Sequence, residues 1–218
     1  MTTHPDVLIV AAFHPELAPF GVALGERMFA RLGGLTVTAR AVGIGLPMAA
    51  VGAALHIAEL RPRAVVLVGT CGAYASAQLA IGDVVVARRV RLVDASVVSG
   101  TAQYPEPMSV VTEAHPAITG ALAATGARVV DVATTLAITV DDAAAARIAR
   151  ATSASVEHLE AHGVATACAV QGVPFAAAFG VANVVGVRAR EEWRTHHRAS
   201  AQAAANTVLK WLPAFASA

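Results

Sequence analysis

The sequence predicts an α/β fold, a single-domain three-layer sandwich in which helices flank a central mixed, largely parallel sheet. Short apolar runs rich in β-branched residues, as at residues 6–12 and 64–69, are typical of strands buried on both faces. Longer segments with helical spacing of apolar residues separate these runs, which is the alternation of α/β folds. With 56% hydrophobic and 14% charged residues, the 218-residue chain can bury a substantial core. We therefore expect one domain over residues 1–218.

The first half of the chain contains five expected strands and two expected helices. The strands are continuous apolar runs or alternating segments, and lie at residues 6–12, 35–40, 64–69, 82–87 and 90–97. The helices have apolar residues at helical spacing and lie at residues 16–32 and 47–60. Pro47 supports the start of the second helix, because proline is favoured in the first turn.

The second half continues the alternation. The expected helices are residues 116–124, 141–150, 159–171 and 190–212, and the expected extended segments are 128–134, 155–158 and 173–181. Asp141 and Asp142 favour a helix start, because carboxylates are stabilised at the positive end of a helix. Ligands of such sheets bind beyond the carboxyl ends of the strands, so we look for chemistry in the loops that follow them.

Charge excludes several classes of partner. Lys and Arg number 16 against 15 Asp and Glu, a net charge of +1. We therefore expect no nucleic-acid partner, because such proteins present a basic face. Lys210 is the only lysine, so the Gly-Lys-Ser/Thr of a phosphate-binding loop is absent.

Hydropathy and cysteine usage bear on location. Residues 161–187 lack Asp, Glu, Lys and Arg, but Gln171, Pro174 and Asn183 interrupt them, so we expect no membrane span. Cys71 and Cys168 lie among apolar residues, which is typical of buried thiols in a reducing compartment. The first residues have no basic segment followed by an apolar core, and we expect a cytoplasmic protein.

Two motifs are too incomplete to predict cofactor chemistry. Gly43 and Gly45 resemble the start of a dinucleotide fingerprint, but Met48 occupies the place of its third glycine. His158 and His162 have zinc-ligand spacing without a glutamate directly after the first histidine. We therefore expect neither a metal nor an organic cofactor.

Two acids and an amide stand out at the predicted sheet edge. Glu16 and Glu160 each lie at a strand-to-helix junction within an apolar stretch, and Asn183 follows the last strand. A single such acid is often no more than a first-turn helix carboxylate. Two carboxylates and an amide at one rim suit hydrolysis of a glycosidic bond, because one acid can activate water while another group holds the sugar hydroxyls.

At these residues the sequence resembles the nucleoside phosphorylase and nucleosidase superfamily over nearly the whole chain. The similar segments, in order, are residues 7–16, 43–45, 68–73 (Val-Gly-Thr-Cys-Gly-Ala), 79–86, 156–161 (Val-Glu-His-Leu-Glu-Ala) and 172–183. The segment 183–193 is most similar to the futalosine hydrolase branch. That branch removes hypoxanthine from futalosine in menaquinone biosynthesis.

The resemblance implies a role for each matching residue. Glu16 would position and deprotonate the attacking water, and Asn183 would contact the N7 region of the purine. Glu160 would accept hydrogen bonds from the ribose 2′ and 3′ hydroxyls, and Leu159 stands where the family usually has a methionine against the sugar.

Further substrate contacts are implied around the sugar and the base. Thr70, Cys71 and Gly72 match the loop beside the water or phosphate site. Val140 lies next to Thr139, the position at which adenine-cleaving relatives place an aromatic platform for the base. We expect all four of the binding positions Thr70, Cys71, Gly72 and Val140 to contact substrate.

The absence of basic side chains at two positions where phosphate would bind favours hydrolysis over phosphorolysis. Phosphate needs cationic or backbone donors. Related phosphorylases have an arginine where Leu67 stands here, and the loop at residues 13–20 offers Glu16 and no basic side chain except histidine. An asparagine at position 183 also suits a 6-oxopurine better than adenine, because it cannot give up a proton to N7.

Three alternatives stay open. The first is a purine nucleoside phosphorylase, and the second is a nucleosidase for methylthioadenosine and S-adenosylhomocysteine. The third is a non-catalytic nucleoside-binding protein of the same fold, which the unusual Leu159 and His162 would allow. The apolar, alanine-rich helices also predict subunit contacts, so we expect a homo-oligomer.

Overall fold

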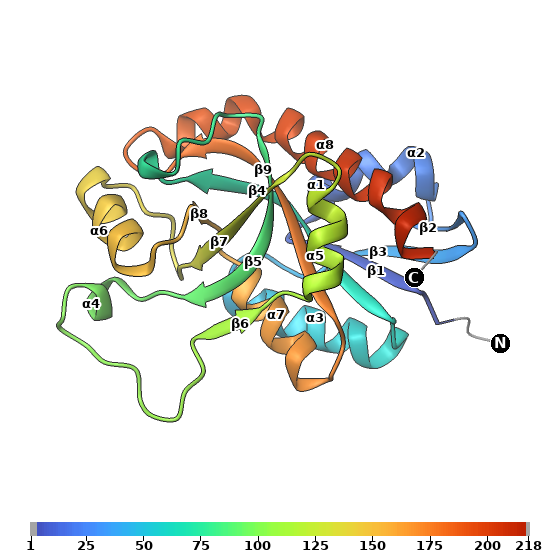
Figure 1. The fold of residues 1–218 in the computed structure, drawn as a ribbon, viewed down its shortest axis with the longest axis horizontal. Helices are drawn as coiled ribbons and strands as arrows, with labels where there is room; N and C mark the ends of the chain where they lie inside the picture. The colour runs from blue at the N-terminus through green and yellow to red at the C-terminus, as the bar shows by residue number, and fades with distance from the viewer. Residues whose placement is uncertain (1–3, 217–218) are drawn as a thin grey trace.

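The predicted α/β sandwich is confirmed by a computed structural model that describes residues 4–216. One mixed nine-stranded sheet lies between helices (Figure 1). Its strands are β1 (Val7–Ala11), β2 (Phe29–Leu32), β3 (Leu35–Ala41), β4 (Ala64–Ala73), β5 (Val84–Leu92), β6 (Val111–Glu113), β7 (Arg128–Thr134), β8 (Val156–Glu157) and β9 (Phe175–Val184).

The helices cover both faces of this sheet. They are α1 (His14–Leu17), α2 (Gly21–Leu24), α3 (Leu46–Leu60), α4 (Ala95–Val98), α5 (Pro116–Ala123), α6 (Asp142–Thr152), α7 (Ala161–Val170) and α8 (Ala189–Ala216). Two short 3₁₀ turns, η1 (Ala18–Phe20) and η2 (Ala75–Ala77), complete the secondary structure of the described residues.

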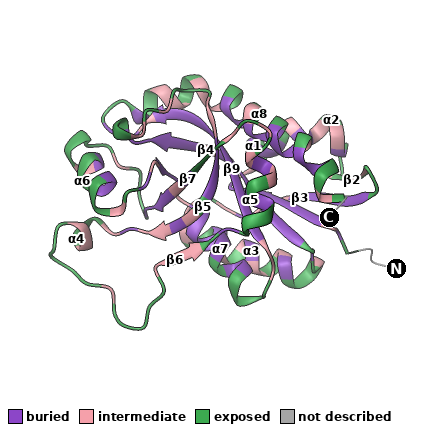
Figure 2. Cartoon of the chain, viewed as in Figure 1, coloured by how far each residue is buried: buried purple, intermediate pink, exposed green. Residues whose placement is uncertain are grey.

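Each central strand is buried on both faces, which is why its sequence is a continuous apolar run. In β1, Leu8 and Val10 pack in a core with α3 and α7. Their neighbours Val7 and Ile9 pack in a second core with α5 and α8. Figure 2 shows the buried strands at the centre of the molecule, with the exposed residues on the outer faces of the helices.

Part of the sheet closes into a ring that the sequence does not predict. Strand β4 pairs with β9, β9 with β5, β5 with β7, β7 with β8, and β8 returns to β4. The register places Gly72 of β4 opposite both Glu157 of β8 and Asn183 of β9. Ring closure therefore gathers polar residues from three strands at one rim.

The helix predicted at residues 16–32 is wrong beyond its first turns. The short segments α1, η1 and α2 end at Gly25, whose φ of 67° breaks the helix. Phe29–Leu32 instead forms β2, which pairs antiparallel with β3. Gly33 and Gly34 have positive φ and form the two-residue turn between these strands, a turn that favours this dipeptide in hairpins.

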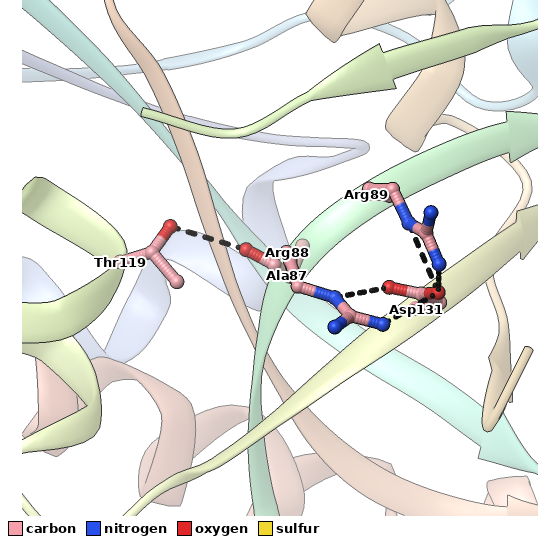
Figure 3. A network of polar contacts seen from close by, with 5 residues as sticks. All are labelled: Ala87, Arg88, Arg89, Thr119 and Asp131. Carbon is pink, nitrogen blue, oxygen red and sulfur yellow. Dashed lines mark hydrogen bonds and ion pairs between the residues drawn. The ribbon is translucent and has the colours of Figure 1, made fainter. Parts of the chain in front are cut away.

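The two strands predicted at 82–87 and 90–97 merge into one strand, β5, with a bulge between Ala87 and Arg89, and the second prediction is wrong beyond Leu92 because residues 95–97 belong to α4. A bulge adds one residue to a strand, so two successive side chains reach the same neighbour. Arg88 Nε lies 2.9 Å from Asp131 Oδ1, and Arg89 Nη2 lies 2.5 Å from Asp131 Oδ2 (Figure 3). Although burial acts to raise the pKa of Asp131, the hydrogen bonds from both arginines hold it below its usual value.

Two smaller expectations also change. Asn183 lies within β9 and not after it, because that strand continues to Val184. Helix α7 begins at Ala161, two residues later than predicted, so Leu159 and Glu160 precede it. Both cysteines are free and buried. Within residues 4–216, no helix combines the length and apolar character needed to cross a bilayer.

Candidate active site

A cavity of about 480 Å³ lies at the rim where β4, β8 and β9 meet. This volume is within the range of small-molecule sites. The predicted residues that line it are Glu16, Thr70, Cys71, Gly72, Leu159, Glu160 and Asn183. Val140 does not line it and is 63% exposed, whereas Ile138, two residues earlier, does line it. The expected contact of Val140 with substrate therefore has no support from this geometry.

Glu16 presents one unpartnered carboxylate oxygen in this cavity. Its Oε1 accepts hydrogen bonds from the Thr70 backbone N–H at 2.9 Å and from Thr70 Oγ1 at 3.0 Å. Its Oε2 is buried without a hydrogen-bond partner among the described residues. A Cβ at Gly69 would lie 2.9 Å from both carboxylate oxygens, so only glycine at that position leaves room for this acid.

Burial raises the pKa of Glu16 to about 7, against an ordinary value of 4.5. The hydrogen bonds from Thr70 oppose this shift, and the nearby Glu160 carboxylate adds to it. The Ala12 backbone amide also lowers the pKa slightly, although it makes no hydrogen bond of good geometry to Oε2. A carboxyl group with a pKa near neutrality is suited to exchange a proton with water or substrate.

Glu160 is held by the glycine turn that precedes α3. Its Oε1 accepts a hydrogen bond of 2.7 Å from the Gly45 N–H, and Gly45 has a φ of 81°. Glycine adopts that backbone conformation without strain, so the residue directs its amide at the acid. The turn at 43–45 therefore positions a carboxylate.

His158 contacts the same carboxylate without forming an ion pair. Its Nδ1 lies 3.2 Å from Glu160 Oε2 and 3.1 Å from the Glu160 backbone nitrogen, which donates to it. Burial lowers the pKa of His158, although Glu160 opposes the shift, so burial favours the neutral form of the ring. The ring stacks on Phe179 at a centroid distance of 4.1 Å, which fixes its orientation.

Asn183 faces Gly72 across the paired strands. A Cβ at Gly72 would lie 2.7 Å from Asn183 Nδ2. The absence of a side chain at Gly72 thus leaves space for the amide, whose Nδ2 donates to the Val184 carbonyl at 3.1 Å. Both residues line the cavity.

Glu157 is a third cavity acid, which the sequence analysis did not select. Its carboxylate accepts hydrogen bonds from the Thr139 N–H at 3.0 Å, from Thr139 Oγ1 at 2.6 Å and from Tyr74 OH at 3.1 Å. Burial raises its pKa, while these donors act to lower it. With three donors already bound, Glu157 holds the 139 loop in place against β8.

Helix α8 supplies four further lining residues that the sequence analysis missed: Ala189, Arg190, Trp193 and Arg194. Trp193 Nε1 donates to Thr70 Oγ1 at 3.0 Å, and Thr70 Oγ1 donates in turn to Glu16. The spacing 190, 193 and 194 places these residues on one side of a helix, which was the available signal. His162 does not line the cavity, and its backbone N–H donates to Thr134 Oγ1.

Three glutamates and His158 line the cavity, but they are not grouped as the ligands of a metal. Among residues 4–216, no three His, Cys, Asp or Glu side chains are grouped so that they could hold a metal ion.

A family model described as the phosphorylase superfamily matches residues 7–216, which include the whole sheet and the cavity. The chain belongs to the phosphorylase superfamily. No curated protein matches the chain by sequence.

Solved structures share the fold of this superfamily member. A methylthioadenosine/S-adenosylhomocysteine nucleosidase from Colwellia psychrerythraea in complex with adenine has a TM-score of 0.85 and 19% identity, covering 96% of this chain and 95% of that chain. An S-adenosylhomocysteine nucleosidase from Streptococcus pyogenes has a TM-score of 0.85 and 20% identity, with coverages of 96% and 97%. A futalosine hydrolase mutant from Helicobacter pylori has a TM-score of 0.83 and 18% identity, with coverages of 94% and 97%.

The sequence predicts a site without basic side chains, but two arginines line the cavity of this phosphorylase-superfamily member. Leu67 is fully buried in the core beneath the site, so the position that would carry an arginine in related phosphorylases offers none here. Two other cations, Arg190 and Arg194, nevertheless line the cavity from α8. The site therefore combines buried acids with arginines from a distant part of the chain.

Proposed function

We propose that this protein is a purine nucleoside N-ribohydrolase whose substrate is futalosine, cleaved to hypoxanthine and dehypoxanthine futalosine in menaquinone biosynthesis. The observation that carries the proposal is the buried Glu16 carboxyl, with one oxygen held by Thr70 and the other unpartnered in a cavity that also contains Glu160 and Asn183. The fold shared with two S-adenosylhomocysteine-type nucleosidases and with a futalosine hydrolase supports it.

In the proposed reaction, the bond between C1′ and N9 breaks and its electron pair goes to the purine, which leaves as its anion and takes a proton from solvent water to become hypoxanthine. Glu160 stabilises the resulting cationic sugar by accepting hydrogen bonds from its 2′ and 3′ hydroxyls. Glu16 orients a water molecule and takes its proton as the water oxygen bonds to C1′. One such general base typically contributes about 10²–10⁴ to the rate.

Asn183 is proposed to steady the charge that develops on the leaving base. Its side-chain N–H can donate to N7 or O6 of a 6-oxopurine, whereas it has no acidic proton to transfer to adenine. Hydrogen-bond patterns of this kind can discriminate strongly between substrates. We therefore favour hypoxanthine as the released base.

The proposal is tested by incubating the protein with futalosine, inosine and methylthioadenosine, each with and without phosphate, and identifying the sugar product. Hydrolysis releases a free sugar at the same rate in both conditions. Activity that needs phosphate and yields a sugar 1-phosphate would instead identify a phosphorylase, which the cavity arginines make the principal alternative. Preference for methylthioadenosine would identify the other nucleosidase class.

Two variants separate catalysis from mere binding. Glu16→Gln is expected to reduce turnover by at least about a hundredfold while ligand affinity stays within about tenfold. Glu26→Gln is the matched control, since Glu26 is exposed and does not line the cavity. Nucleoside binding without turnover in the unmodified protein would favour a non-catalytic binding protein.

We also propose that the protein is a cytoplasmic homo-oligomer. Met48, Val51 and Leu55 are each more than half exposed and are spaced along one side of α3, and the equally exposed Ile44 lies in the turn just before this helix. Ile44 also lines the cavity, so a second copy on this surface would lie beside the site. Contiguous exposed apolar surface of this kind marks contact sites.

A further inference from the structure

Arg190 and Arg194 form a pair of unengaged cations in the cavity wall. They are one helical turn apart on α8, so their side chains leave the same side of the helix. Both line the cavity, and neither makes an ion pair or a side-chain hydrogen bond to another described residue. Arg188, on the same segment, is already engaged, because its Nη2 lies 3.0 Å from Glu192 Oε1.

The acids of the cavity do not neutralise these arginines. Glu16 is held by Thr70, Glu160 by Gly45, and Glu157 by Thr139 and Tyr74. The guanidinium groups therefore remain free to bind something that enters from outside. Arginine presents a planar fork of N–H donors that matches a carboxylate or a phosphate, and two arginines on one side favour an anionic group.

If the ligand is a purine nucleoside, as the proposed function requires, the anionic group bound by the two arginines can lie on only one part of it. In a purine ribonucleoside, C1′ bears the base and C2′ and C3′ bear the hydroxyls assigned to Glu160. Only C5′ remains to carry an extension. Trp193, between the two arginines in sequence, is held by its hydrogen bond to Thr70 and stacks on His197 at a centroid distance of 4.4 Å. Its fixed ring offers an apolar surface for such an extension.

We propose that Arg190 and Arg194 form a subsite for an anionic group on the 5′ substituent of the nucleoside. This inference rests on the proposed nucleosidase function and deepens it, because it defines the substrate class as 5′-anionic purine nucleosides. Inorganic phosphate is the competing source of the same anion chemistry. It would have to react at C1′ beside Glu16, whose ionised carboxylate repels it.

The test compares pairs of substrates in which one member carries an anionic group on the 5′ substituent and the other does not. The probes are 5′-deoxy-5′-(3-carboxypropylthio)inosine and its methyl ester, with inosine 5′-monophosphate against inosine as a second pair. The unmodified protein is expected to favour the acid over its ester by about tenfold or more in kcat/KM, and this preference should weaken in high salt. An equal kcat/KM for acid and ester would overturn the subsite.

Variants locate the effect. In the double variant Arg190→Gln/Arg194→Gln, the ratio of kcat/KM for the acid to kcat/KM for the ester is expected to fall by at least about tenfold. Arg198→Gln, one turn further along α8 and outside the cavity lining, should keep the ratio of the unmodified protein. If the ratio falls equally in Arg198→Gln, the assignment of the subsite to Arg190 and Arg194 is overturned. It is also overturned if the only defect of the double variant is a loss of phosphate-dependent activity.

Direct binding separates failure of the subsite from failure of the proposed reaction. If neither futalosine nor any of the probes is cleaved, the nucleosidase proposal fails, and the dissociation constants of the acid and ester are compared by calorimetry. Tighter binding of the acid that is lost in the double variant would still support the subsite. Equal affinities for acid and ester would overturn it.

Discussion

Glu16 combines two requirements that oppose each other in a folded protein. Its burial and its unpartnered Oε2 destabilise the ionised carboxylate, yet the proposed base must be ionised to accept a proton. The two hydrogen bonds from Thr70 to Oε1 partly offset the burial. The outcome is a pKa of about 7, which leaves both protonation states populated near neutral pH.

This pKa predicts the pH dependence of the proposed reaction. Because only the ionised form can take a proton from water, kcat/KM should fall as the pH drops below about 7, approaching tenfold per pH unit. The measurement is a profile of kcat/KM from pH 5 to 9 with a neutral substrate. An acid limb centred near 4.5, the ordinary value for glutamate, would contradict it.

The same shift predicts the pH dependence of stability. The folded pKa of Glu16 lies above the unfolded value of 4.5, so the folded state binds more protons between pH 4.5 and about 7. Its contribution to the free energy of unfolding is therefore full below pH 4.5 and is lost as pH rises to 7, by about 3 kcal/mol. Glu16→Gln should accordingly raise the stability at pH 8 by up to about 3 kcal/mol. Urea unfolding at pH 4 and pH 8 checks this, and equal effects at both values would count against it.

Helix α8 packs very closely against strand β9 at Gly180. A Cβ at Gly180 would lie 2.0 Å from the Ser200 carbonyl oxygen, and Ser200 Oγ donates to the Val181 carbonyl at 2.8 Å. This approach lets α8 lie against β9, from where its first turns reach the cavity.

Gly180→Ala is therefore expected to destabilise the protein by about 3 kcal/mol, because backbone must move to admit the methyl group. In thermal unfolding this corresponds to a Tm lower by roughly 6–12 °C. Gly120→Ala in α5 is the control, since nothing lies within 4 Å of its Cβ position. It should gain about 0.5–1 kcal/mol of stability from helix propensity. Similar Tm values for the two variants would refute the packing argument.

The elements that local patterns predicted well are those with one dominant periodicity. Strand β7 (Arg128–Thr134) and helix α3 match their predicted segments closely, because each has an unbroken run of its own pattern. Segment 16–32 was misassigned because its apolar residues fit helical spacing up to Gly25. The Gly33-Gly34 turn was the stronger signal there, since it fixes the hairpin of β2 and β3.

The apolar side of α3 makes a prediction for the whole assembly. Leu55→Arg places a charge on the exposed row formed with Ile44, Met48 and Val51, and should shift a homo-oligomer toward the monomer. Sedimentation velocity measures the change. Val22→Arg is the control, because Val22 is fully exposed on α2 and lies outside this row. A monomeric unmodified protein, or equal effects of both substitutions, would refute the oligomer proposal.

Local sequence patterns were sufficient to predict the α/β layers and the placement of Glu16, Glu160 and Asn183 at one rim of the sheet. Both follow from periodicity and from polar residues at strand ends, which depend on near neighbours in the chain. The closed ring of strands, Glu157 and the α8 residues of the cavity depend instead on contacts between distant segments. Trp193 and Thr70, for example, are 123 residues apart and meet through a single hydrogen bond. No local pattern specifies such a contact, because it arises only when the packed cores on both faces of the sheet bring α8 to the rim.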